Sequence, residues 1–114
     1  EGEPIQLARR LAREHGLTCV VTLGAAGAVA VGPAGGWRVG SLSIEPVDTT
    51  GAGDAFVGVL AAALDAGKTM PDALHRASIA AGLACLAMGA QSSQPLASAI
   101  EDRLEVLPPP APLD

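Results

Sequence analysis

The sequence is poor in aromatic residues, cysteine and positive charge. Its 114 residues include one Trp, one Phe and no Tyr, so the core must consist mainly of Ala, Val, Leu and Ile, which suits close packing of helices on a sheet. Cys19 and Cys85 both lie in apolar runs, which favours buried free thiols in a reducing compartment over a disulfide. Seven basic and twelve acidic side chains give a net charge of −5, which argues against a nucleic-acid interface.

Long uninterrupted apolar runs are also missing. Gly and charged residues break the longest runs, which are too short to cross a bilayer, so we expect no membrane association. No basic segment followed by an apolar stretch opens the chain, so we expect no signal peptide and a cytoplasmic protein.

The spacing of apolar residues in the first half predicts a helix followed by short strands. Residues 4–15 have apolar side chains at helical spacing between Pro4 and Gly16, which predicts an amphipathic helix. Residues 18–23 form a β-branched run typical of a strand that is buried on both faces. Further short strands are expected over residues 28–31, 37–39 and 42–44, the last two as antiparallel excursions.

The second half of the chain reads as helical. Residues 55–66 are apolar nearly all round, which predicts a buried helix closed by Gly67. Further helices are expected over residues 71–88 and 95–104. We therefore expect one α/β unit over residues 1–106 and a Pro-rich, disordered tail over residues 107–114. The sheet looks cut short at its beginning, so we expect a fragment of a larger domain.

The segment Gly51-Ala52-Gly53-Asp54 lies directly before the predicted buried helix. Small residues allow a ligand to approach the backbone, and the unpaired N–H groups of a first helical turn attract anions such as phosphate. Asp54 could accept a proton from an attacking hydroxyl, so the segment fits phosphoryl transfer. Taken alone, it also fits an ordinary glycine-rich loop with Asp54 as the helix cap.

Two other nucleotide-binding motifs are excluded. Gly67-Lys68-Thr69 resembles the end of a P-loop, but Ala62 stands where the motif requires Gly. A dinucleotide fingerprint fails because Phe56 stands in place of its third Gly. His15 and His75 are expected on polar helix surfaces, and neither has a metal-ligating neighbour in the sequence.

Three collinear blocks resemble the PfkB/ribokinase family of carbohydrate kinases. Asp48-Thr-Thr-Gly-Ala-Gly-Asp54 is similar to the family's C-terminal signature, and Thr22-Leu-Gly-Ala-Ala-Gly27 to its loop beside the nucleotide. Gly89-Ala-Gln-Ser-Ser93 is similar to a segment typical of ribokinases. The resemblance implies an α/β, ribokinase-like fold, of which this chain is the C-terminal part, with a mostly parallel sheet flanked by helices.

The resemblance also implies the roles of individual residues. Asp54 would be the base that binds and deprotonates the sugar hydroxyl, and the amides of Gly51, Ala52 and Gly53 would form the anion hole. The adenine nucleotide would lie beside Gly53, with Ser78, which stands where ribokinases have His or Asn, near the base. The loop that lines the nucleotide would consist of Thr22, Leu23, Gly24, Ala25, Ala26 and Gly27. A potassium ion would be held by Asp48, Thr50, Ser93 and the backbone carbonyls of Ala84, Ala87 and Gly89.

The function implied by the resemblance is transfer of the γ-phosphate of ATP, with Mg²⁺, to a sugar hydroxyl, with ribose as the leading substrate. Fructokinase, keto-deoxy-gluconate kinase and nucleoside kinase remain open within the family, as does a homodimer of the intact protein. Since family members carry a sugar-binding half before this segment, the chain alone is expected to be inactive. The alternatives are a non-catalytic nucleotide- or anion-binding module, and a subunit completed by a separate polypeptide.

Overall fold

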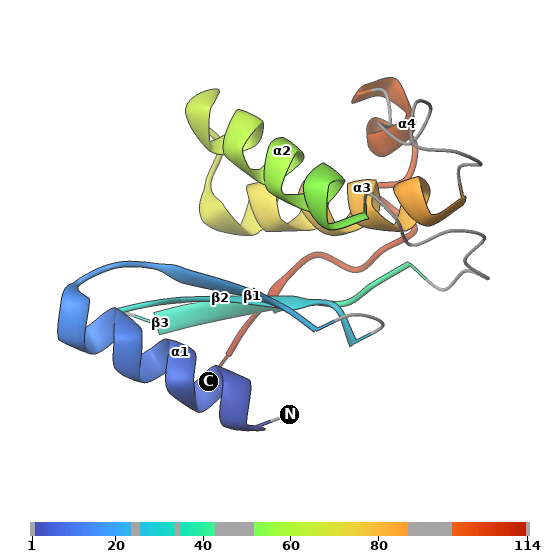
Figure 1. Ribbon diagram of the computed structural model, residues 1–114. Coiled ribbons are helices and arrows are strands. Elements are labelled where there is room, and N and C mark those ends of the chain that lie inside the picture. The colour runs from blue at the N-terminus through green and yellow to red at the C-terminus, as the bar shows by residue number, and fades with distance from the viewer. Residues whose placement is uncertain (1, 24–25, 34, 43–51, 87–96, 114) are drawn as a thin grey trace.

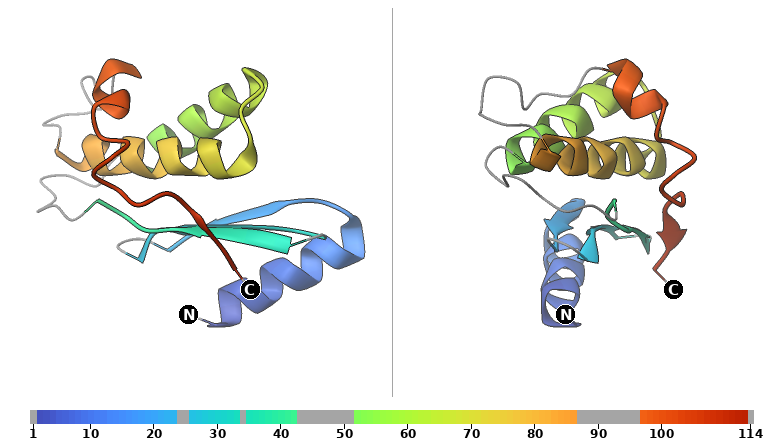
Figure 2. Two further views of the ribbon diagram at one scale, coloured as in Figure 1. Left: turned by 180° about the vertical axis from the view of Figure 1, so that it is seen from behind. Right: turned by 90° about the vertical axis from the view of Figure 1, so that its right-hand side faces the viewer.

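The computed structural model describes residues 2–23, 26–33, 35–42, 52–86 and 97–113. A sheet lies between two layers of helices: α1 covers one face, and α2 and α3 lie over the other (Figures 1 and 2). In chain order the elements are α1 (Gly2–His15), β1 (Cys19–Thr22), β2 (Ala28–Gly32), β3 (Gly35–Val39), α2 (Ala52–Asp65), α3 (Met70–Leu86), α4 (Ala97–Glu101) and β4 (Ala111–Pro112).

The four strands are arranged in the order β1-β2-β3-β4, and each neighbouring pair is antiparallel. The expectation of a mostly parallel sheet therefore does not hold among the described strands. The links between β1 and β2 and between β2 and β3 are short hairpin connections, whereas a parallel pair would need a crossover of a dozen residues or more. The predicted strand over residues 42–44 is not seen at Leu42, which is buried outside any strand, and residues 43–44 lie outside the described residues.

The side chains of β2 point alternately to the two faces of the sheet, so this strand contributes to two hydrophobic cores. Val29 and Val31 pack with Ala8 and Ala12 of α1, whereas Ala28 and Ala30 belong to the cluster beneath α2 and α3. Successive side chains of a strand point to opposite faces, so a continuous apolar run is suited to a strand covered on both sides. β1, at the edge of the described sheet, is half-buried rather than fully buried as predicted.

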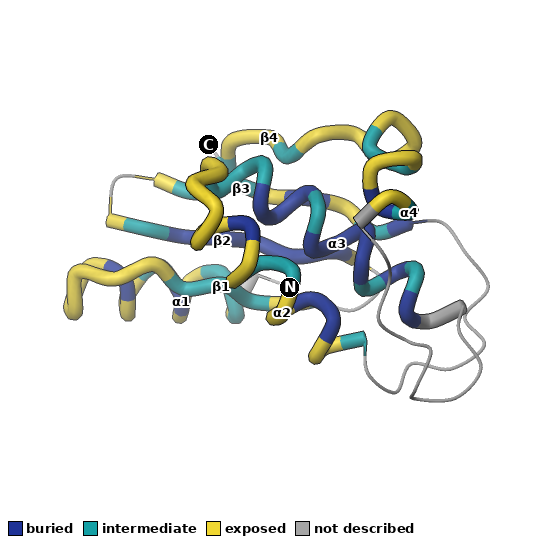
Figure 3. The backbone as a smooth tube through the Cα atoms, turned by 90° about the horizontal axis from the view of Figure 1, so that it is seen from above, coloured by how far each residue is buried: buried dark blue, intermediate teal, exposed yellow. Residues whose placement is uncertain are grey.

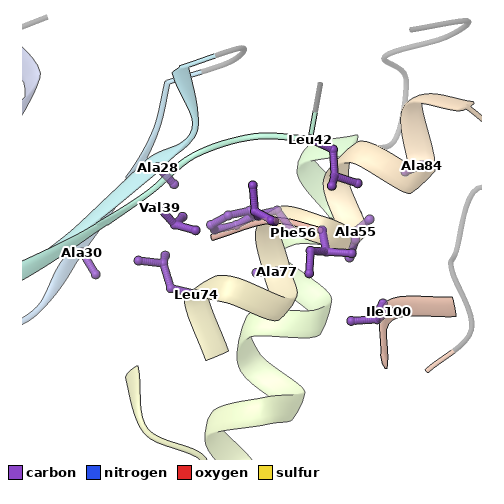
Figure 4. Packing of buried hydrophobic residues seen from close by; sticks show 13 residues of the cluster. Ala28, Ala30, Val39, Leu42, Ala55, Phe56, Leu74, Ala77, Ala84 and Ile100 are labelled. Carbon is purple, nitrogen blue, oxygen red and sulfur yellow. The ribbon is translucent and has the colours of Figure 1, made fainter. Parts of the chain in front are cut away.

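The larger core contains the single Phe of the chain. Phe56, from α2, lies with Val39 of β3, Leu74 of α3 and Leu42 (Figure 4). Leu74 is completely buried, so this cluster attaches the helical layer to the sheet. α2 packs against α3 on one side only. Contrary to the prediction of burial nearly all round, it leaves Val57 63% exposed.

The proline-rich tail, which the sequence analysis expects to be disordered, packs along the sheet over residues 107–113. Leu107 is buried, and its carbonyl lies 2.7 Å from Nε2 of His75. The exposed β4 then runs beside β3 (Figure 3), where the Leu113 amide donates a hydrogen bond to the Gly36 carbonyl at 3.0 Å. Proline is tolerated there because an edge strand needs donors on one side only.

His75 is accordingly buried and 8% exposed, whereas the sequence suggested a polar helix surface. The tail covers it, which periodicity within the helix does not predict. Cys19 is a free thiol, and it is half-buried where the sequence predicted burial. Among the described residues no helix is long and apolar enough to cross a membrane.

Candidate functional site

The N-terminus of α2 and the loop between β1 and β2 lie at the same end of the molecule, in two views related by 180° (Figures 1 and 2). These segments carry two of the three sequence blocks, and the third, residues 89–93, lies outside the described residues. The first turn of α2 is positioned by the helical core, and the loop after β1 is positioned by its own hydrogen bonds and by the end of β3.

At the start of α2, two residues are buried in the core and the two residues before them are exposed. Ala55 is 0% exposed and Phe56 4%, so the helix is attached to the core directly after the motif. Gly53 and Asp54, immediately before them, are exposed. A helix of 14 residues that begins at Ala52 has unpaired N–H groups in its first turn and a partial positive charge there.

The backbone at Gly53 is open to an approaching ligand. A Cβ atom added at this position would meet nothing within 4 Å. This side of the first turn therefore has room for a side-chain atom among the described residues, which is consistent with the approach of an anion to the first-turn amides. The exposed Asp54 carboxylate lies on the same turn. Gly51, the remaining predicted anion-hole residue, lies outside the described residues.

The loop after β1 is held by hydrogen bonds of its own. The Leu23 amide donates to the Gly27 carbonyl at 2.7 Å, and the Ala26 amide donates to the Leu23 carbonyl at 3.1 Å. Thr22 and Ala26 are exposed, and Leu23 is half-buried. Of the six residues predicted to line the nucleotide, Gly24 and Ala25 lie outside the described residues.

Gly27 has a structural reason to be glycine. Its φ is +96°, and a Cβ there would lie 2.8 Å from both the carbonyl carbon and the Cα of Gly40, and closer still to the Val39 carbonyl oxygen. The loop is thus packed directly against the residues where β3 ends. The sequence motif included Gly27, but its close contact with Val39 and Gly40 comes from tertiary packing.

Ser78 is buried in α3, and its hydroxyl donates a hydrogen bond to the Gly40 carbonyl at 2.5 Å. Its predicted place near the adenine base stays a prediction. Gly40 was not among the residues singled out from the sequence, because an isolated glycine after a strand has no distinctive local pattern.

Most of the predicted potassium ligands lie outside the described residues: Asp48, Thr50, Ala87, Gly89 and Ser93. Ala84 is buried near the end of α3, which extends to Leu86. Its carbonyl stays a predicted cation ligand, because the residues that follow Leu86 lie outside the described residues. Within the described part of the chain, no group of three or more His, Cys, Asp or Glu side chains could hold a metal ion.

The family is decided by comparison of the whole sequence with known families. The sequence model of the pfkB family carbohydrate kinases matches residues 1–97, which include both motif segments. The chain belongs to this family.

Individual relatives agree with the family. Ribokinase of Bacillus subtilis is 45% identical over 64 residues, which are 56% of this chain. The structure of Arabidopsis thaliana ribokinase complexed with ribose and ATP superposes with a TM-score of 0.73 at 30% identity over 77% of this chain. A putative ribokinase II from E. coli, in complex with ATP and Mg²⁺, gives a TM-score of 0.84 at 27% identity over 90% of this chain. The fold is therefore ribokinase-like.

The chain is much shorter than these relatives. The match covers 22% of the Bacillus subtilis ribokinase, 29% of the Arabidopsis chain and 33% of the E. coli chain.

Proposed function

We propose that this chain is the nucleotide-binding part of a kinase that transfers the γ-phosphate of ATP to a sugar hydroxyl, with ribose as the leading substrate. The observation that carries the proposal is the first turn of α2, where the open backbone of Gly53 and the exposed carboxylate of Asp54 lie side by side. Membership of the carbohydrate-kinase family, and relatives solved with ribose and ATP or with ATP and Mg²⁺, support it.

In this proposal Asp54 accepts the proton of the attacking sugar hydroxyl. The amides of Gly51, Ala52 and Gly53 bind the transferred phosphoryl group, whose negative charge the positive end of the helix dipole stabilises. Little covalent chemistry is required of the protein in phosphoryl transfer, so positioned amides and one carboxylate are sufficient machinery. When bound with ATP, Mg²⁺ would neutralise charge on the phosphates.

The nucleotide is proposed to lie along the loop of residues 22–27, with Ser78 at the base. A potassium ion held by the six ligands named above would stabilise the anion hole, and Ala84 lies in the last described turn of α3. A cytoplasmic location and a homodimer of the intact protein also remain predictions.

Binding at the anion hole is tested by titrating the chain with Mg·ATP in a calorimeter, in potassium and in sodium buffers. Two glycines of α2 provide a matched pair, because a Cβ at either Gly53 or Gly58 would meet nothing within 4 Å. Gly53→Val should abolish measurable binding by blocking the approach of phosphate, whereas Gly58→Val, in the middle of the helix, should leave the affinity unchanged. Equal affinities in the two variants would refute the anion-hole assignment.

The role of Asp54 is tested in the complete kinase by steady-state kinetics. Asp54→Asn should lower kcat by about 10²–10⁴-fold, as expected for loss of a general base, and leave the KM for ATP nearly unchanged. Asp65→Asn, at the exposed C-terminal end of the same helix, is the control and should behave as wild type. A parallel loss of ATP binding in Asp54→Asn would indicate a structural role.

The second candidate is a nucleotide- or anion-binding module without catalysis. The observation that favours it is the open backbone at Gly53, because first-turn amides bind an anion whether or not a base lies beside them. Mg·ATP binding by the chain, together with a complete kinase whose turnover is insensitive to Asp54→Asn, would decide for this candidate.

A further inference from the structure

Residues 40–42 connect β3 to the segment that carries the phosphoryl-transfer motif, and α3 contacts this connection in two successive turns. Ser78 donates its hydrogen bond to the Gly40 carbonyl at 2.5 Å. One turn later, a Cβ added at Gly82 would lie 2.9 Å from Cδ1 and 3.0 Å from Cβ of Leu42. Because residues four apart share one helix face, a single face of α3 holds both ends of this connection.

The same connection also contacts the base of the loop after β1, at Gly27. Gly27 approaches so closely that a Cβ there would lie 2.8 Å from two backbone atoms of Gly40. Gly27 also accepts the hydrogen bond from the Leu23 amide that closes the loop. Gly40 is therefore placed between the Ser78 hydroxyl and the base of the loop, so a shift of Gly40 moves the loop with it.

Ser78 is suited to hold Gly40 in place. It is 4% exposed, so water has little access to compete for its hydroxyl, and its partner lies 38 residues away in the sequence. The link is long-range and comes from a helix whose neighbouring residues Leu74, Ala77 and Ile79 are completely buried. The donor is thus rigidly held, which makes the bond a positional constraint on Gly40.

We propose that Ser78 is a positioning residue for the nucleotide: through the Gly40 carbonyl it fixes Leu23 and Gly27, the two described ends of the loop after β1, in the conformation that binds ATP. This inference rests on the proposed function for the identity of the ligand. The mechanical part, the link from Ser78 through Gly40 to the loop, rests on the contacts alone.

The mechanical part is tested by amide hydrogen exchange on the chain. Ser78→Ala should speed exchange of the Leu23 amide about tenfold, because the acceptor Gly27 loses its fixed support. The Lys68 amide, which is bonded to the Ala63 carbonyl at the far end of α2, should keep its rate. Ser78→Thr retains the hydroxyl and should restore the Leu23 rate, and Ser98→Ala, at an exposed serine of α4, is the control. Equal acceleration at Leu23 and Lys68, or none at Leu23, would overturn the proposal.

The effect of Ser78 on nucleotide binding is measured by steady-state kinetics of the complete kinase. Ser78→Ala should raise the KM for ATP by about 2–10-fold, the range set by one lost hydrogen bond, and Ser78→Thr, which keeps the hydroxyl, should restore it. Faster Leu23 exchange without a change in the KM for ATP would refute the positioning role. If the wild-type chain binds no Mg·ATP, the proposed function fails, whereas the exchange rate of Leu23 still decides whether Ser78 supports the loop.

Discussion

Replacement of Gly27 by alanine separates backbone strain from steric overlap at the base of the nucleotide loop. The residue has φ +96°, which costs a side-chain-bearing residue about 1–2 kcal/mol. The added Cβ would also overlap the backbone of Val39 and Gly40. Relieving such an overlap typically costs a further 1–3 kcal/mol or so. The free energy of unfolding should therefore fall by roughly 2–5 kcal/mol, a large part of the stability of a small domain.

Gly67 provides the matched control. Its φ is +90°, but a Cβ there would meet nothing within 4 Å. Gly67→Ala should therefore cost only the backbone term, about 1–2 kcal/mol. The difference between the two variants isolates the overlap, which is specific to the contact between the loop and the end of β3.

The assay is urea unfolding followed by the fluorescence of Trp37, the single Trp of the chain, which lies half-buried in β3. With a urea dependence of about 1–3 kcal/mol per M, the two midpoints should differ by on the order of 1 M. Identical midpoints for Gly27→Ala and Gly67→Ala would show that the loop does not press against Val39 and Gly40, and the reasoning would be wrong.

Two further predictions concern the core and the tail. Leu74→Ala removes a completely buried side chain and should lower the free energy of unfolding by about 2–5 kcal/mol. Leu64→Ala, on the exposed side of α2, is the control and should cost under about 1 kcal/mol. Similar urea midpoints for the two variants would contradict the core assignment. His75→Ala should destabilise the chain by about 1–3 kcal/mol and increase acrylamide quenching of Trp37, since Pro112 of the tail pairs with Trp37. His15→Ala, at an exposed position, should do neither, and unchanged quenching in His75→Ala would show that the histidine does not hold the tail.

Local patterns in the sequence were sufficient for the helices and for one part of the site. Apolar periodicity placed the first helix within a few residues of the observed Gly2–His15, and Gly16 ends it with φ +63° as a glycine cap requires. The glycine-rich segment before an apolar helix likewise predicted a helix start there, and α2 begins at Ala52 with Gly53 and Asp54 exposed, whereas the anion hole stays a prediction. Such features depend on neighbours within one or two helical turns, so the sequence contains the information directly.

Tertiary structure alone decided which distant residues meet. Two buried polar side chains of the described residues find partners far along the chain: His75 bonds a carbonyl 32 residues away, and Ser78 one 38 residues away. The antiparallel pairing and the ordered proline tail are of the same kind. The unpaired N–H and C=O groups of a β-strand can pair with a parallel or an antiparallel neighbour. Proline lacks one N–H donor, so it prevents hydrogen bonding on only one edge of a strand. Which alternative is adopted depends on the packing of the whole domain, and no short window of sequence contains it.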